Sequence, residues 1–445
     1  MNVCDSDTLD SALSSYGFSR VNSLAGADVV ILNTCAVRAQ AEQKAFSFLG
    51  RAEEFKKEKN PGIKIVVIGC MAQRLGAKIS KRFHSVDLII GAKDIDNAAQ
   101  LIMQCGVCNL ESGVNGSGLP RQDFVLSRND AMPVILSEAK NPSFAVNSTL
   151  HPPNSTLSHI VRYVTIMRGC DNYCSYCVVP YVRGKEISLD YKNIVRECEI
   201  MAENGAKEIM LLGQNVNSYR FEDADFASLI KKVSLIDGIE RIRFMTNHPK
   251  DLNDDLINIM AEETKVCSHI HLPIQSASNN ILKAMNRKYT YEHYLGLVKK
   301  LRTKIPDINI TTDIIAGFPG ETEEDFQASL KAVRDIRFGG LYVFRYSPRP
   351  DTKAAAMRDD VPLEEKKRRH AAILEESNRI SIEIVSQSVG TVQEVLTEKY
   401  ENGVLEARTR SGRKVFVGGG EEHLGKNINV LIKEAKINSL FGDII

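Results

Sequence analysis

Three short apolar runs, separated by amphipathic stretches, mark the first hundred residues of the chain. The runs cover Val29–Leu32, Ile63–Ile68 and Val86–Ile90. Continuous apolar runs of this length, with helix-like spacing between them, are typical of buried parallel strands in an α/β sheet. Cys35 and Cys70 closely follow the first two runs, and the carboxyl ends of neighbouring parallel strands meet at one sheet edge. The pattern therefore predicts an amino-terminal α/β domain with two thiols at one edge.

A second series of strand-then-helix units follows and predicts a partial (β/α) barrel. Its six predicted strands are Tyr163–Met167, Glu208–Leu212, Ile242–Met245, His269–Leu272, Ile308–Ala316 and Leu341–Tyr346. Beyond Val389 the sequence pattern changes to short predicted strands separated by Gly and Asn turns, which is typical of a small closed β-barrel. The stretch 106–160, rich in Gly, Ser, Asn and Pro, is expected to be a linker or a surface insertion.

These boundaries predict an α/β protein of three domains. We expect the amino-terminal domain at 1–105, the linker at 106–160, the partial barrel at 161–382 and the small β-barrel at 383–445. The 445 residues are 43% hydrophobic and 25% charged with a net charge of +1, which excludes a disordered or strongly polyelectrolyte chain. No apolar run reaches the roughly 18 residues that a membrane span needs, and the chain starts with acidic residues. A cytoplasmic protein without membrane segments is expected.

The strongest chemical signal is a cysteine triplet that follows a predicted strand. Cys170, Cys174 and Cys177 have three and then two residues between them. Three thiolates so close in sequence can hold three irons of a [4Fe-4S] cluster and leave the fourth iron open for an exogenous ligand. A structural zinc ion would want four protein ligands, and no further Cys or His follows at zinc-finger spacing. The spacing therefore favours an iron–sulfur cluster over zinc.

The loop that holds the triplet resembles the CxxxCxxC motif of radical SAM enzymes. The resemblance implies that Cys170, Cys174 and Cys177 are the catalytic cluster ligands and that the open iron binds S-adenosylmethionine (SAM), whose cleavage yields a 5′-deoxyadenosyl radical. The protein itself would orient SAM and keep water away from the radical. The surfaces expected near SAM are formed by Gly213, Gln214, Gln275, Ser276 and Gly317.

Motifs on both sides of the triplet resemble the MiaB type of methylthiotransferase. Stretches that resemble methylthiotransferases in general are Val178–Glu186, Leu211–Tyr219, His271–Ser276 and Asp313–Thr322. Those that resemble the MiaB type in particular are Ile166–Gly169, Gly213–Asn217 and Leu282–Tyr289. The resemblance implies a transferase that acts on N(6)-isopentenyladenosine at tRNA position 37. Two SAM-dependent steps would place a methylthio group on carbon 2 of the adenine. Sister types, which modify threonylcarbamoyladenosine in tRNA or a ribosomal protein, stay open as alternatives.

The same resemblance implies a second, auxiliary [4Fe-4S] cluster held by three cysteines of the amino-terminal domain. Cys35 and Cys70 match the second and third of these, whereas the first is absent, because Met1 aligns two residues past it. We therefore expect a misplaced start or a truncation. Cys4 lies on the expected first turn of a helix and is not expected to meet the other two cysteines. A SAM-cleaving or RNA-binding remnant that cannot insert sulfur is the alternative function.

The last sixty residues resemble the TRAM domain, which grips the substrate. The cations expected to contact RNA phosphates are Arg408, Arg410, Arg413 and Lys414. A general contribution to solubility is the alternative role for these side chains. The implied partners are the anticodon stem-loop of a tRNA, an electron donor such as flavodoxin or ferredoxin, and a source of sulfur. A monomer is expected.

Four cysteines lie outside these motifs. Cys105 and Cys108 form a CxxC pair beside the expected linker, where coincidence is favoured over a redox site. Cys198 and Cys267 lie in apolar settings and are expected to be buried packing residues.

Two further polar features are expected to be structural. His269 and His271 alternate on one predicted strand, so one of them is expected to face the interior in a packing role. The basic run 366–370 lies in a predicted helix and is expected to be a solvated face.

Overall fold

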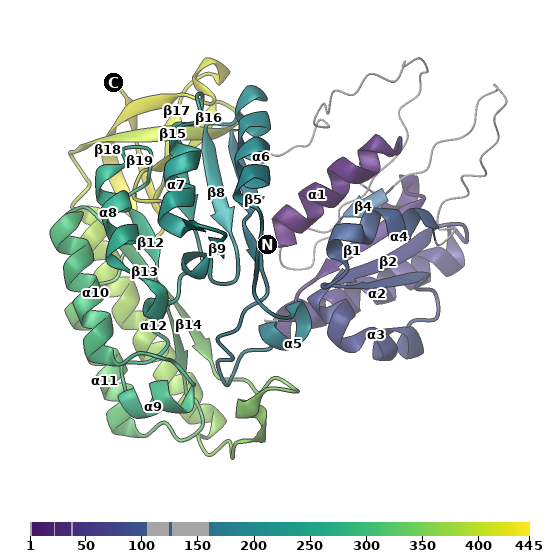
Figure 1. The fold of residues 1–445 in the computed structure, drawn as a ribbon, viewed down its shortest axis with the longest axis horizontal. Coiled ribbons are helices and arrows are strands. Elements are labelled where there is room, and N and C mark those ends of the chain that lie inside the picture. The colour runs from purple at the N-terminus through teal and green to yellow at the C-terminus, as the bar shows by residue number, and fades with distance from the viewer. Residues whose placement is uncertain (1, 22, 37–38, 105–123, 127–159) are drawn as a thin grey trace. The chain divides into compact units, whose positions relative to one another are not determined.

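The computed structural model describes residues 2–21, 23–36, 39–104, 124–126 and 160–445 (Figure 1). Cys105, Cys108 and nearly all of the expected linker therefore lie outside the described residues. No helix within the described part is long and apolar enough to cross a membrane.

The chain divides into two compact units. The first contains residues 1–155 together with 178–184, and the second contains residues 156–177 and 185–445. Residues 178–184, which we expected in the partial barrel, thus belong with the amino-terminal unit. The partial barrel and the carboxy-terminal β-barrel share the second unit.

The first unit is built on a parallel sheet with the strand order β3-β2-β1-β4. Its strands are β1 Val29–Thr34, β2 Lys64–Gly69, β3 Leu88–Gly91 and β4 Phe124–Leu126. Its helices are α1 Asn2–Ser15, α2 Ala39–Glu58, α3 Cys70–Arg82, α4 Ala98–Gln104 and α5 Val179–Arg183. Apolar clusters lie on both faces of the sheet, which explains why β1 and β2 are almost continuously apolar. The three predicted strands of this domain are confirmed.

The second unit contains six parallel barrel strands in two three-stranded sheets, with the orders β11-β8-β5 and β12-β13-β14. The strands are β5 Val161–Thr165, β8 Glu208–Leu212, β11 Arg241–Phe244, β12 His269–His271, β13 Asn309–Ala316 and β14 Gly340–Arg345. A single bridge from Ile242 to Val266 links the two sheets beside β12. The half-barrel therefore has β5 and β14 as its two edges, and the predicted partial barrel is confirmed.

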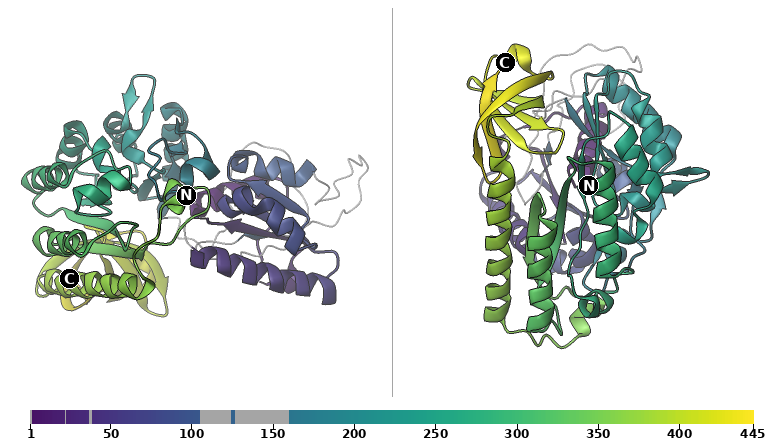
Figure 2. Two further views of the ribbon diagram at one scale, coloured as in Figure 1. Left: turned by 90° about the horizontal axis from the view of Figure 1, so that it is seen from below. Right: turned by 90° about the vertical axis from the view of Figure 1, so that its left-hand side faces the viewer.

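Helices cover the outer side of these strands (Figures 1 and 2). They are α6 Tyr191–Glu203, α7 Phe226–Ser234, α8 Asp254–Glu262, α9 Asn279–Ala284, α10 Tyr291–Lys304, α11 Glu323–Ile336 and α12 Leu363–Ser386. Six of them begin after a capping side chain that accepts a hydrogen bond from the first helical turn, which satisfies an otherwise unpaired backbone N–H. The capping residues are Asp190, Asp225, Asn253, Ser278, Thr290 and Thr322. The apolar faces of these helices pack against the barrel strands in one large hydrophobic core.

Two short antiparallel strand pairs complete the first part of this unit. They pair β6 Met167–Arg168 with β7 Ile187–Ser188, and β9 Arg220–Phe221 with β10 Ala224–Asp225.

The carboxy-terminal part is a closed five-stranded barrel with the order β15-β16-β17-β19-β18. Its strands are β15 Val392–Glu401, β16 Val404–Thr409, β17 Lys414–Gly418, β18 Asn427–Lys436 and β19 Ser439–Ile444. The long helix α12 lies along β14 and leads into this barrel (Figure 2). Because α12 continues to Ser386, the expected domain boundary at 383 falls inside a helix.

Candidate functional site

The cysteine triplet lies in a loop that leaves the carboxyl ends of β5 and β6. The backbone N–H of Cys177 donates to the carbonyl oxygen of Cys174 at 2.9 Å. The segment that follows α9 holds this loop, since Asn286 Nδ2 donates to the carbonyl of Tyr173 at 2.9 Å. Ser175 adds a donation from its hydroxyl to the carbonyl of Ala284 at 2.8 Å. The loop is therefore fixed by contacts from a part of the chain more than a hundred residues away.

A buried cation lies beside the triplet. Arg287 Nη1 donates to Cys174 Sγ at 3.4 Å and Arg287 Nη2 donates to the carbonyl of Pro273 at 3.0 Å. A cation next to a thiolate favours the charged form that binds iron. Sequence reasoning used Arg287 only as part of a motif and missed this contact, because nothing in the local pattern links it to Cys174.

The donor set of the triplet fits a [4Fe-4S] cluster. Cys174 is buried, and Cys170 and Cys177 are partly exposed, so the thiols can face a bulky group. Burial raises the pKa of Cys170, so metal binding would have to displace its proton. Within the described ranges, no three His, Cys, Asp or Glu side chains are gathered tightly enough to hold one metal ion. The thiolates of a [4Fe-4S] cluster each bind a different iron, so they can stand further apart than the ligands of a single metal ion.

Two of the residues expected near SAM carry polar atoms without a partner. Gln214 follows β8, and both its Oε1 and Nε2 are buried without a hydrogen bond. Gln275 follows β12, is 7% exposed and has an unpaired Oε1. Buried polar atoms in proteins are nearly always hydrogen-bonded, so unpaired ones at the carboxyl ends of strands indicate a polar ligand.

The other expected SAM residues are already engaged or offer only backbone. The hydroxyl of Ser276 accepts from the backbone N–H of Ser278 at 3.2 Å and lies 3.4 Å from Ser329 Oγ. Gly213 follows β8 directly and packs against Met167. These positions shape the strand ends rather than offer free side-chain groups.

Asn247 and His248, which follow β11, were missed by sequence reasoning. Asn247 Oδ1 and His248 Nε2 are buried and unpaired. Burial lowers the pKa of His248, so its ring is neutral, and Nδ1 accepts from the backbone N–H of Lys250 at 3.2 Å. The proton is therefore assigned to Nε2, which becomes an unsatisfied donor. Their position at a strand end was the signal that would have found them.

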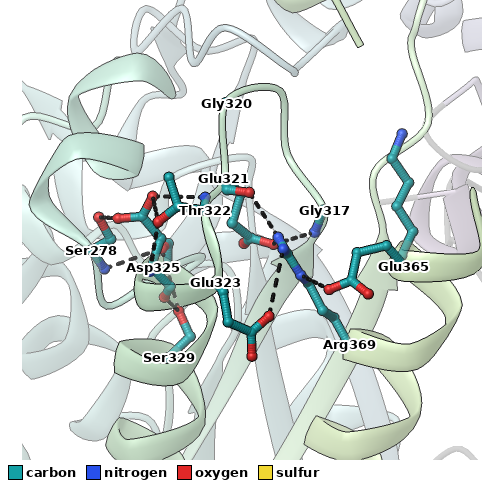
Figure 3. Close-up of polar contacts among 12 residues, drawn as sticks. Ser278, Gly317, Gly320, Glu321, Thr322, Glu323, Asp325, Ser329, Glu365 and Arg369 are labelled. Atoms are coloured by element: carbon teal, nitrogen blue, oxygen red, sulfur yellow. Dashed lines mark hydrogen bonds and ion pairs between the residues drawn. The ribbon is translucent and has the colours of Figure 1, made fainter. Parts of the chain in front are cut away.

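Gly317 directly follows β13 and opens a loop that is held by α12 (Figure 3). Its backbone N–H donates to Glu321 Oε2 at 2.7 Å, and Arg369 Nη1 donates to the same oxygen at 2.8 Å. Arg369 Nε also donates to Glu365 Oε1 at 2.7 Å. The carboxylate of Glu321 thus receives two charge-assisted hydrogen bonds and fixes the loop.

The expectation of a solvated face for the basic run 366–370 was wrong for half of its cations. Arg369 and Lys366 are each 5% exposed. Lys366 Nζ lies 2.6 Å from Asp359 Oδ1. Residues three apart share a helix face, so these two point inward while Lys367 and Arg368 are exposed.

A second candidate site lies at the carboxyl edge of the first unit's sheet. Cys35 follows β1, and Cys70 begins α3 directly after β2. Thr34 pairs with Gly69 in the parallel register, so the two cysteines start from neighbouring positions. Gly69 has φ +96°, and a Cβ there would lie 2.6 Å from the Thr34 carbonyl oxygen, so only glycine fits.

Arg183 connects this edge to the first turn of α1. Its guanidinium donates to Asp5 Oδ2 at 3.0 Å, with both side chains buried, and it also hydrogen-bonds to the Cys70 thiol. Burial raises the pKa of Cys70, and the nearby Arg183 opposes that rise. Ser6 lies here too, because its hydroxyl accepts from Asn33 Nδ2 at 3.0 Å. Asp5 and Ser6 of α1 therefore lie at the cysteine edge, and the expectation that Cys4 does not meet Cys35 and Cys70 stays a prediction.

The four cations expected to bind RNA differ in what they already contact. Arg408 donates to both carboxylate oxygens of Glu398, at 2.6 and 2.9 Å. Arg410 donates to the carbonyls of Thr264 and Val266. Lys414 pairs with Glu406 at 2.6 Å, whereas the side chain of Arg413 has no partner among the described residues. Arg413 is therefore the cation of this set that is open to a phosphate.

The two cysteines that were expected to be packing residues are buried. Cys198 in α6 is fully buried and Cys267 is 1% exposed, as predicted. His269 Nε2 and His271 Nδ1 lie 3.2 and 3.0 Å from the same hydroxyl, Thr311 Oγ1. The expectation that only one of the two histidines faces inward was wrong, because side chains at i and i+2 of a strand share a face.

His269 predicts a loss of stability in acid. Burial lowers its pKa from 6.5 to about 3, helped by Arg243, His271, Arg408 and Arg413. Between these values the unfolded chain binds a proton that the folded chain does not, so the free energy of unfolding falls as the pH falls. His269→Gln is expected to make urea midpoints less dependent on pH between about pH 6.5 and about pH 4. Equal pH slopes for the variant and the wild type would contradict this assignment.

Comparisons with known families agree with this architecture. Family models match residues 164–333 as the radical SAM superfamily, 386–445 as the TRAM domain and 1–91 as the uncharacterized protein family UPF0004. Among solved structures, the radical SAM methyltransferase TsrM of Kitasatospora setae has a TM-score of 0.55 at 15% identity. That likeness covers 89% of this chain and 76% of TsrM, and it supports the fold alone.

Full-length relatives identify the family. The tRNA-2-methylthio-N(6)-dimethylallyladenosine synthase of Endomicrobium trichonymphae is 65% identical over all of this chain and 97% of its own length. The enzyme of the same name from Geotalea uraniireducens is 41% identical over all of this chain and 96% of its own length. With the cysteine triplet on a half-barrel and the carboxy-terminal β-barrel, the chain belongs to the tRNA-2-methylthio-N(6)-dimethylallyladenosine synthases, the MiaB type of radical SAM methylthiotransferase.

Proposed function

We propose that the chain converts N(6)-isopentenyladenosine at tRNA position 37 to its 2-methylthio derivative, using SAM in two steps. The observation that carries the proposal is the 65% identity over the full chain to a synthase of that name. The triplet loop, the unpaired polar side chains at the strand ends and the TRAM match support it.

Cys170, Cys174 and Cys177 would hold the radical SAM cluster. A [4Fe-4S] cluster with one iron free of protein ligands supplies the electron that cleaves SAM. Gln214 and Gln275 would bind the polar groups of SAM through the amide atoms that have no partner in the protein. Half-barrel walls would exclude water from the radical.

Cys35 and Cys70 would supply two of the thiolates that hold the auxiliary cluster. Arg183 would offset the negative charge of the Cys70 thiolate, which it already contacts. The sulfur carried there would receive a methyl group from the first SAM. A second SAM molecule would be used to remove the hydrogen from carbon 2 of the adenine.

The RNA partner would be the anticodon stem-loop, with the target base splayed out of the loop. Arg413 is the TRAM cation that we assign to a phosphate. A flavodoxin or ferredoxin would supply the electrons, and an external donor would supply the sulfur. The protein would act as a monomer in the cytoplasm.

Nucleoside mass spectrometry of tRNA from a strain lacking the gene tests the proposal. The 2-methylthio-isopentenyladenosine is expected to disappear and to return when the gene is restored. Loss of the methylthio form of threonylcarbamoyladenosine instead would reassign the chain to the sister type. Anaerobic reconstitution is expected to yield about eight irons per chain, whereas about four would support the remnant that cannot insert sulfur.

A further inference from the structure

A cavity of about 730 Å³ lies between the amino ends of the half-barrel strands and the carboxy-terminal β-barrel. Glu208, Asn309 and Tyr342 reach it from the strands, and Arg413 reaches it from the start of β17. The cysteine loop follows the opposite, carboxyl ends of the strands. This basal cavity is therefore separate from the residues assigned to SAM.

The charges around the basal cavity leave two of its cations without an ion pair among the described residues: Lys399, which is exposed to solvent, and Arg413, which is partly buried. Each carboxylate of its lining is paired with a cation: Glu208 with Arg243, Glu398 with Arg408, and Glu406 with Lys414. Arg413 has no carboxylate or carbonyl partner for its guanidinium in the part of the chain that the structure describes, and burial lowers its pKa. A partly buried cation without a partner is unfavourable by itself, so an anion that enters the cavity gains a strong interaction.

Two buried acceptors face the same space. Glu208 is 1% exposed, and its Oε2 has no hydrogen bond because Arg243 donates only to Oε1, at 2.9 Å. Asn309 donates through Nδ2 to the carbonyl of Ser411 at 2.7 Å, which leaves Oδ1 buried and unpaired. Water molecules can satisfy such acceptors, but water does not neutralise Arg413. A ligand that carries both N–H donors and an anion satisfies all three groups.

An aromatic surface completes the basal cavity. Tyr342 is 55% exposed and lines it, and Tyr163 lines it from the other edge strand. Tyrosine rings at the surface of RNA-binding sites stack on bases. A volume of about 730 Å³ lies within the range of small-molecule sites and accommodates one nucleotide.

We propose that the basal cavity binds one nucleotide of the RNA substrate, with its phosphate on Arg413 and an amino-bearing base against Glu208 and Asn309. This nucleotide differs from the modified one, which must reach the SAM side of the half-barrel. The proposal rests on the proposed function only for the identity of the RNA.

Binding of a fluorescently labelled anticodon stem-loop, followed by anisotropy, tests the proposal. Arg413→Gln in the full chain is expected to weaken binding about tenfold and to reduce the slope of log affinity against log salt by about one. Lys433→Gln is the matched control. It removes one positive charge from the same small barrel, where Lys433 is exposed and pairs with Asp443, and it is expected to change affinity less than about twofold.

Competition by small molecules tests the base contact. AMP is expected to displace the RNA from the wild type about tenfold more effectively than ribose 5-phosphate, because only AMP carries an amino donor for the two acceptors. UMP, which lacks that amino group but keeps a base that can stack, is expected to compete more weakly than AMP. Equal competition by AMP and ribose 5-phosphate would overturn the assignment of Glu208 and Asn309 to a base.

Equal losses in the Arg413 and Lys433 variants, or no loss in either, would overturn the proposal. Circular dichroism checks that the variants fold. Should Arg413→Gln fail to fold, Arg413→Lys replaces it: this variant keeps the positive charge and is expected to retain the wild-type slope of log affinity against log salt. Binding of free AMP that does not displace RNA would mean a free nucleotide site and would overturn the RNA assignment. If the tRNA nucleoside test fails while Arg413→Gln still weakens RNA binding, only the substrate of the proposed function is wrong.

Discussion

Replacing Cys70 by alanine is expected to abolish methylthio transfer while cleavage of SAM continues. Cys70 and Cys35 follow paired residues of β1 and β2, and under the proposed function they would supply two thiolates to the auxiliary cluster. Loss of one ligand removes that cluster, whereas the triplet lies in the other unit of the chain. Iron per chain is expected to fall from about eight to about four. Iron and sulfide assays, release of 5′-deoxyadenosine and nucleoside mass spectrometry measure the three effects.

Cys198→Ala is the matched control for this experiment. Cys198 is also a buried thiol, but it packs inside α6 against the half-barrel core. The control is expected to keep about eight irons and full transfer, with only a packing loss of about 1 kcal/mol in the free energy of unfolding. Retention of both clusters in the Cys70 variant, or equal iron loss in the two variants, would rule out Cys70 as a ligand.

Replacing Arg243 by methionine is expected to lower the free energy of unfolding by about 3–5 kcal/mol. The Arg243 side chain is 3% exposed and donates to Glu208 Oε1 at 2.9 Å. Its two terminal nitrogens donate to the carbonyls of Arg410 and Thr409, at 2.9 and 2.7 Å, and so hold the carboxy-terminal barrel on the strands. The variant leaves Glu208 as a buried unpaired charge and leaves two carbonyls without their donor. Urea unfolding measures the loss.

Two further variants test whether the buried pair is the cause. Arg379→Met removes an arginine that lies on the exposed face of α12 and pairs there with Glu376, and it is expected to change stability by less than about 0.5 kcal/mol. Adding Glu208→Gln to Arg243→Met is expected to recover part of the loss, because the unpaired charge disappears. A loss below about 1 kcal/mol for Arg243→Met alone would contradict the role of this pair.

Much of the fold could be predicted because its signals are local. Apolar runs and their spacing located the strands of the half-barrel and of the first unit's sheet to within about two residues, except β4, which lies in the expected linker. Strand period and helix period depend only on neighbouring positions. The triplet could be predicted as a set of cluster ligands because three thiols with this spacing lie within one loop. Domain limits were harder, since 178–184 leave the barrel segment to pack in the first unit.

The state of charged side chains was the weakest part of the prediction. Arg408, Arg410 and Lys414 resembled a phosphate-binding set, yet each is engaged inside the second unit, and only Arg413 is open among the four. Arg369 resembled a solvated cation and instead fixes the loop after β13. The sequence of a basic run does not show whether its side chains form ion pairs with carboxylates or are hydrated.

By itself, the sequence determined the strand order along the chain, the thiol spacing that suits a cluster with an open iron, and the membership of a family. Only the tertiary structure decided that Arg183 contacts the Cys70 thiol, that Arg287 contacts Cys174, and that a cavity beneath the half-barrel leaves Arg413 uncompensated. The reason is physical: periodicity and spacing are properties of adjacent residues. The partner of a buried charge, in contrast, is set by whichever distant segment packs against it.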